Sequence, residues 1–123
     1  MVRFANPAQF QRLSDMLLPW FAWATVILVP VGLFYALVNS PADYQQGETV
    51  RIMYLHVPAA WMALFTYTMM AVASAVSLIW KHPLADVAAR AAAPLGAAFT
   101  ALALITGMLW GEPMWGTWWV WDA

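Results

Sequence analysis

Two groups of residues in this 123-residue chain could bind a ligand. The first is a tryptophan-rich stretch near the C-terminus, where five of the nine tryptophans fall between Trp110 and Trp121. The second is His56, which stands in the segment Met53–Ala60. Indole rings offer flat apolar faces with N–H donors at their edges, and imidazole is a common axial ligand of haem iron. The tryptophans therefore favour a large, flat, amphipathic ligand, and His56 could ligate a metal within it.

Each of these features also has an ordinary structural explanation. Tryptophans favour the headgroup level of a membrane, although such an aromatic belt accounts for only one or two of them at each helix end. A lone histidine at an interface is most often only a polar group at a helix end. Arg51 could pair with a ligand carboxylate through its planar guanidinium, or equally with Glu48 or Asp122. Residue chemistry alone leaves these alternatives open.

Several other chemistries lack the residues that they need. The chain contains no cysteine, which excludes disulfides, thiolate metal sites and thiol catalysis. Its sequence has no phosphate-binding loop of the Gly-x-x-x-x-Gly-Lys-Ser/Thr type and no credible serine triad or pair of carboxylates. A formal net charge of -1 provides no field for holding nucleic acid. We therefore expect neither an enzyme nor a nucleic-acid-binding protein.

Membrane-spanning helices must position these residues. Hydrophobic residues make up 64% of the chain and charged residues 9%, against about 45–50% and about 25% in soluble domains. Three uncharged runs, residues 17–38, 57–80 and 91–110, are long enough to cross a hydrocarbon core of about 30 Å. None of them alternates as the strands of a barrel do. The sequence thus predicts a single all-α integral membrane domain over residues 1–123, with three transmembrane helices.

The basic residues predict how these helices are oriented. Four of the five lie before the first span or around the turn between the second and third spans: Arg3, Arg12, Lys81 and Arg90. Cytoplasmic loops carry the excess of lysine and arginine, so the N-terminus and this turn are predicted to be cytoplasmic. Residues 39–56 and 111–123 then share the outer face.

This orientation brings His56 and the tryptophans together on the outer face. His82 is assigned to the opposite side, so the two histidines cannot grip one metal across the bilayer. Gly111, Pro113 and Gly116 predict irregular backbone, rather than continued helix, in the outer segment. A ligand site is therefore expected at one end of the helices.

The tryptophan-rich segment resembles a known signature. Residues 115–122, WGTWWVWD, are similar to the WWD motif of the haem-handling proteins of cytochrome c-type biogenesis. The nearest resemblance is to the haem exporter protein C family, CcmC. Residues 41–47 and 54–60 also resemble that family's first outer loop and the start of its second span. The resemblance covers the chain from the first span onward.

The resemblance implies a fold and a set of haem-binding residues. The fold is the first half of a six-span haem-handling protein in the bacterial inner membrane, with its haem site facing the periplasm. His56 matches the first of two axial histidines, and Arg51 is retained as a further haem-binding candidate. The residues that match the signature are Trp115, Gly116, Trp118, Trp119, Trp121 and Asp122. The second axial histidine and the later spans are not among the 123 residues, so we expect an N-terminal half.

The resemblance also implies partners and a task. The protein would hold haem, as haem b, beside the ABC transporter subunits CcmA and CcmB and the small subunit CcmD. It would present haem to the haem chaperone CcmE for cytochrome c maturation. The related cytochrome c haem lyases share the signature, but the short first loop and the early position of the signature argue against them. The alternative function is a structural subunit that assembles a membrane transporter complex, with the tryptophans as an interfacial anchor.

Overall fold

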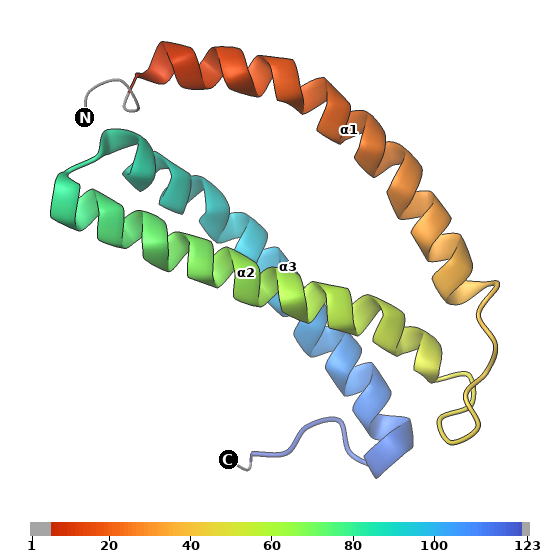
Figure 1. Cartoon of the computed structure of the whole chain (residues 1–123). Coiled ribbons are helices and arrows are strands. Elements are labelled where there is room, and N and C mark those ends of the chain that lie inside the picture. The colour runs from red at the N-terminus through yellow and green to blue at the C-terminus, as the bar shows by residue number, and fades with distance from the viewer. Residues whose placement is uncertain (1–5, 122–123) are drawn as a thin grey trace.

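The computed structural model describes residues 6–121, and these form three long helices. Their bounds are Pro7–Leu37 for α1, Val50–Trp80 for α2 and Pro83–Trp115 for α3 (Figure 1). Each is long and apolar enough to cross a membrane. A helix of 31 residues, such as α1 or α2, extends roughly 46 Å at 1.5 Å per residue. The prediction of three transmembrane helices is confirmed.

The helices extend beyond the apolar runs from which they were predicted. The second begins at Val50 rather than at residue 57, so Pro58 lies inside α2 and not at its opening. The third runs from Pro83 to Trp115. Its first turns include an ion pair between Asp86 and Arg90, 2.8 Å apart, four residues along the helix. The uncharged runs end at such charged residues, whereas the backbone hydrogen bonds of the helix continue past them.

Helices α2 and α3 form an antiparallel pair joined by a turn at Lys81 and His82. Small residues line their contact, and such residues let two helices approach each other closely in a membrane. At Gly96 of α3, an added Cβ would lie 3.1 Å from Cγ2 of Thr66. The buried residues of the described chain all belong to this pair: Ala59, Thr66, Ala92, Thr106 and Gly111.

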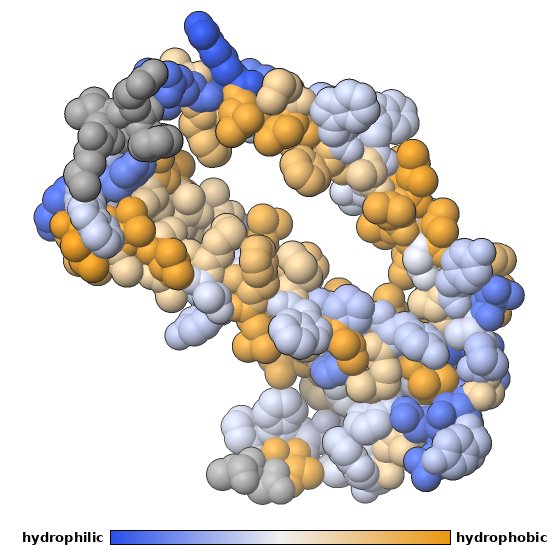
Figure 2. All heavy atoms as spheres, viewed as in Figure 1, coloured by the Kyte–Doolittle hydropathy of each residue, from blue (hydrophilic) through white to orange (hydrophobic). Residues whose placement is uncertain are grey.

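Helix α1 stands apart from this pair along most of its length (Figures 1 and 2). All 31 of its residues are described, and none of them is buried. Large apolar side chains such as Trp20, Ile27 and Leu28 are exposed along it. In Figure 2, hydrophobic atoms lie along α1 on both sides of a paler patch near its middle, and the most hydrophilic atoms gather toward the ends of the molecule. This distribution suits a helix whose surroundings are lipid or further protein.

Two irregular segments lie at the same end of the molecule. One is the loop between α1 and α2, and the other is residues 116–121 after α3, hereafter the tail (Figure 1). The start of α1 and the turn between α2 and α3 lie at the opposite end. This arrangement agrees with the predicted topology, which assigns residues 39–56 and 111–123 to one face.

Candidate functional site

A cavity of about 520 Å³ lies where α2, α3 and the tail meet. Helix α2 contributes His56, the tail contributes Trp118 and Trp119, and α3 contributes a row of small residues. That row is Ala103, Gly107 and Gly111, which share one face of α3 because they are four residues apart. His56 is the one ionisable side chain in the lining, as far as the described residues go. The cavity therefore offers mostly apolar walls and a single imidazole.

Hydrogen bonds to α3 determine which nitrogen of His56 is free. The Nδ1 atom lies 2.9 Å from the backbone oxygen of Ala103 and 3.1 Å from Oγ1 of Thr106. A carbonyl oxygen can only accept, so Nδ1 carries the hydrogen and donates it. In the neutral ring Nε2 then keeps its lone pair, which is the form of imidazole that binds a metal. His56 thus lines the cavity with a ring whose Nε2 has no hydrogen-bond partner among the described residues.

Gly107 leaves the space that the imidazole of His56 occupies. An added Cβ at this position would lie 3.1 Å from Cε1 and 3.5 Å from Nδ1 of the ring. Any other residue type would therefore press against the ring. Gly107 and the hydrogen bonds at Nδ1 together set the position of the imidazole against α3.

The tryptophans reach the cavity because the chain turns back at the end of α3. The turn is made by Gly116, whose φ of 74° lies in the left-handed region that glycine adopts without strain. Its N–H donates to the backbone oxygen of Glu112 over 2.8 Å. Helix α3 therefore runs through Gly111 and Pro113, and the prediction of irregular backbone from residue 111 was wrong by about one turn. Pro113 does not interrupt the helix, which ends two residues later at Trp115.

The five C-terminal tryptophans do not have equivalent positions. Trp115, Trp118 and Trp119 line the cavity. Trp121 packs edge to face on Trp119, with ring centroids 5.4 Å apart, but it is 92% exposed and outside the lining. Trp110 packs edge to face on Trp115 at 4.7 Å, behind the cavity wall. Asp122 lies outside the described residues.

The loop between α1 and α2 is tied to the end of α3. The indole N–H of Trp110 donates to Oε1 of Gln46 over 2.9 Å. Oδ1 of Asp43 accepts from the backbone N–H groups of Gln45 and Gln46, both at 2.9 Å, which shapes the loop locally. The loop thus supports Trp110, and Trp110 in turn supports Trp115.

Replacing Gln46 with leucine should destabilise this end of the protein by about 1 kcal/mol, because the half-buried indole N–H of Trp110 loses its acceptor. Thermal unfolding in detergent measures the effect. Gln45 is the matched control, since its side chain is exposed at the neighbouring position. Equal destabilisation by Gln45→Leu and Gln46→Leu would contradict this role of Gln46.

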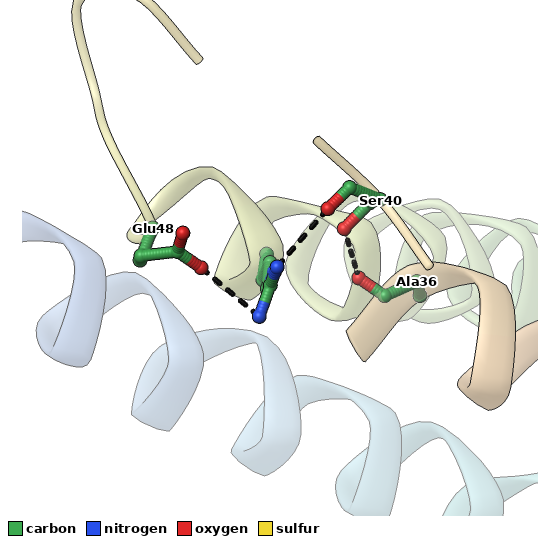
Figure 3. Close-up of polar contacts among 4 residues, drawn as sticks. Ala36, Ser40 and Glu48 are labelled. Carbon is green, nitrogen blue, oxygen red and sulfur yellow. Dashed lines mark hydrogen bonds and ion pairs between the residues drawn. The ribbon is translucent and has the colours of Figure 1, made fainter. Parts of the chain in front are cut away.

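Arg51 contacts residues of the loop between α1 and α2 rather than the cavity. Its guanidinium pairs with Oε2 of Glu48 at 2.9 Å and donates to the backbone oxygen of Ser40 over 3.0 Å. Ser40 in turn donates through Oγ to the backbone oxygen of Ala36 over 2.7 Å (Figure 3). Arg51 does not line the cavity. Its contacts join the start of α2 to the end of α1, in agreement with the alternative that it pairs with Glu48.

The structure also adds residues that the sequence analysis missed. Thr106 and Gly107 contact His56 directly, and Met108 lines the same cavity. The spacing of Ala103, Gly107 and Gly111 by four residues, leading into the tryptophans, was the available signal. His82, by contrast, lies in the turn between α2 and α3, at the end of the molecule opposite to the tail.

Comparison with known proteins gives a consistent match over the whole chain. Residues 1–123 match the profile of the family described as CcmC, Heme exporter protein C. The Bradyrhizobium diazoefficiens protein of that name is 58% identical over 123 residues, which are 100% of this chain and 46% of the relative. The Escherichia coli K12 protein is 48% identical over 121 residues, which are 98% of this chain and 49% of the relative. The Paracoccus denitrificans protein is 50% identical over 119 residues, 97% and 49% of the two chains. The chain therefore spans about half the length of the curated relatives that it matches.

Proposed function

The chain belongs to the Heme exporter protein C (CcmC) family, and from this premise we propose that it holds haem for export and cytochrome c maturation. The haem would lie at the cavity between α2, α3 and the tail. The observation that carries the proposal is that His56, Trp118 and Trp119 line one cavity although they lie far apart in the sequence. The family is named for export rather than for a chemical reaction, which agrees with the expectation that the chain is not an enzyme.

The residues around the cavity fit haem as a cargo. A volume of about 520 Å³ lies within the range of roughly 300–1,000 Å³ that is typical of small-molecule sites. The lining is mainly apolar, as the faces of a porphyrin require, and suits haem b held without a covalent bond. Within residues 6–121, no three side chains of His, Cys, Asp or Glu gather into a metal site. His56 offers one imidazole, and histidine is a common axial ligand of haem iron, so it would be the residue that holds the iron of a bound haem.

The side chains around the cavity would have distinct tasks. Nε2 of His56 would ligate the iron, and the rings of Trp118 and Trp119 would contact the porphyrin. Trp115 and Gly116 would hold the tail in place, and Trp121 would pack on Trp119 beyond the cavity. Asp122 is kept as a haem-binding candidate from the signature alone. These assignments follow from the lining and from the packing of the rings.

Arg51 is the remaining haem-binding candidate. It lies on α2, five residues before His56, and is half-buried against Glu48 and Ser40. Its guanidinium could bind a haem carboxylate only after leaving Glu48. The Glu48 side chain is 68% exposed, and surface ion pairs contribute roughly 0–1 kcal/mol, so a ligand carboxylate would compete with Glu48 at little cost.

The charge distribution supports a location for the site. Basic residues concentrate at the start of α1 and around the turn between α2 and α3, which favours a cytoplasmic position for that end. We therefore infer that the protein lies in the bacterial inner membrane with the cavity at the periplasmic face. There it would present haem to the chaperone CcmE, beside CcmA, CcmB and CcmD. Since the relatives are about twice as long, a second axial ligand would come from outside residues 1–123.

Replacing Trp118 and Trp119 with leucine tests the proposal. In the full-length protein in lipid nanodiscs, the double variant should bind haem about tenfold more weakly, because aromatic contacts of roughly 0.5–1.5 kcal/mol each are lost. Haem titration followed at the Soret band measures the dissociation constant. The control is Trp20→Leu with Trp23→Leu, because these exposed indoles of α1 lie outside the cavity.

The same variants distinguish the alternative function as an assembly subunit. No residue of α1 is buried, so its surface is available for contacts with further protein, which is the observation behind that alternative. If the Trp118 and Trp119 variant assembles poorly with its partners but binds haem as the wild type does, the tryptophans act as an anchor. Equal haem loss in both tryptophan pairs would also contradict a specific platform.

A further inference from the structure

We propose that Thr106 is a positioning residue for His56: its hydroxyl holds the imidazole with Nδ1 protonated and Nε2 free toward the cavity. The inference rests on the proposed function, since it concerns how the chain prepares His56 for an iron. It assigns a role to a residue of α3 that neither touches the ligand nor belongs to the tryptophan signature.

The hydroxyl of Thr106 is placed to accept from His56, because its own hydrogen is used by carbonyl oxygens within α3. Thr106 is 5% exposed, so water does not compete for its oxygen. Oγ1 donates its hydrogen to the backbone oxygen of Leu102 over 2.7 Å, the usual bond of a threonine to the preceding turn of its helix. The lone pairs of the oxygen remain, and one faces Nδ1 of His56 at 3.1 Å. The helix therefore orients Thr106 as an acceptor before any ligand binds.

Nδ1 of His56 consequently faces two acceptors and no donor among the described residues. The backbone oxygen of Ala103 at 2.9 Å is the second acceptor. If Nδ1 lost its hydrogen, its lone pair would face the lone pairs of the Ala103 carbonyl, and Thr106 would have to give up its hydrogen bond to Leu102 in order to donate to Nδ1, so the opposite tautomer is disfavoured. Hydrogen bonds from the far nitrogen of a ligating imidazole also orient the ring and strengthen its donation to the metal. Gly107, which follows Thr106 in α3, leaves room for the imidazole in this position.

The test compares Thr106→Val with Thr106→Ser in the full-length protein in nanodiscs. Valine keeps the shape but removes the acceptor, and serine keeps the acceptor but removes a methyl group. We expect Thr106→Val to weaken haem binding about tenfold, at the lower end of the effect of outer-shell partners on metal affinity. Thr106→Ser should remain within twofold of the wild type. Haem titration at the Soret band measures both.

Thr66→Val is the matched control. Thr66 is also 5% exposed and also donates to the preceding turn, to the backbone oxygen of Met62 over 2.7 Å. It lies in the contact between α2 and α3 but away from His56. Thr66→Val should leave the haem affinity within twofold of the wild type. Should Thr106→Val fail to fold, Thr106→Ala replaces it with the same expected loss.

A second measurement reports on the tautomer without haem. In the haem-free protein with ¹⁵N-labelled histidine, the wild type should show His56 with Nδ1 protonated, and Thr106→Val should show a smaller share of this tautomer, because the carbonyl of Ala103 alone remains as acceptor. An unchanged tautomer with unchanged haem affinity in Thr106→Val would overturn the inference, as would an equal loss in Thr66→Val. His56→Ala separates this result from failure of the proposed function. If His56→Ala weakens haem binding and Thr106→Val does not, only the role of Thr106 is lost.

Discussion

Replacing His56 with alanine should weaken haem binding by the full-length protein at least about a hundredfold. The physical reason is that His56 supplies the one imidazole in the lining of the cavity, and its Nε2 is left free by the hydrogen bonds at Nδ1. Loss of a direct ligand should cost more than loss of an outer-shell partner, which typically costs 10–100-fold. A hundredfold change corresponds to about 2.7 kcal/mol of binding free energy. Titration at the Soret band measures the affinity, and the ligand-field bands report the change of axial ligand.

Two controls accompany this variant. His82→Ala removes the other histidine of the chain, which lies at the opposite end of the molecule, and should leave haem binding unchanged. Added imidazole should partly restore the spectrum of His56→Ala, because the truncated side chain leaves space beside Gly107. A wild-type spectrum and affinity in His56→Ala would remove this residue as an iron ligand. The remaining proposal would then be an apolar platform of tryptophans alone.

Replacing Gly107 with valine should also reduce haem binding strongly, by tenfold or more. Even a single Cβ at this position would lie 3.1 Å from Cε1 of His56, so the branched side chain must displace the imidazole. Overpacking of this kind typically costs about 1–3 kcal/mol. Part of this cost should appear as weaker packing of α2 on α3, and part as loss of the ring position from which Nε2 faces the cavity.

Haem titration and thermal unfolding in detergent, measured on the same samples, separate the two parts. Gly32→Val is the matched control, since an added Cβ at Gly32 of α1 meets nothing within 4 Å. Gly107→Ala should give an intermediate loss, because the ring has to move by only a few tenths of an ångström. Haem affinity equal to the wild type in Gly107→Val would contradict the close packing of His56 on α3.

The number of membrane-spanning helices was predictable because it depends on summed hydrophobicity. Each apolar run is long enough to span the hydrocarbon core, and transfer free energies add along such a run whatever its neighbours are. The exact ends of the helices do not follow from this sum. Residues 50–56 and 83–90 contain charges, yet they continue α2 and α3 as regular helix. Backbone hydrogen bonding, rather than hydropathy, determines where these helices begin.

The sequence predicted only that His56, Trp118 and Trp119 lie at the same face of the membrane. It did not predict that they line one cavity. Charge asymmetry places both segments on one side, but that face is wide enough for the two to remain apart. Their approach depends on Gly116, where the chain turns back at the end of α3, and on a row of small residues that leaves the cavity open. Arg51 lies only five residues before His56 on the same helix, but it does not line the cavity. It pairs with Glu48 and donates to the backbone oxygen of Ser40 instead.

Composition and the order of residues thus account for the number of spans, for the minimum length that the thickness of the lipid requires of them, and for the kinds of side chain present in the loop and the tail. They do so because each depends on properties that a residue carries into any environment. That Nε2 of His56 is the free nitrogen does not depend on such properties. It depends on a carbonyl of Ala103 and a hydroxyl of Thr106, about fifty residues away in the chain, and these acceptors reach the ring only when α2 and α3 pack side by side. Hydrogen bonds and close contacts act over a few ångströms, so the chemistry of this imidazole follows from packing.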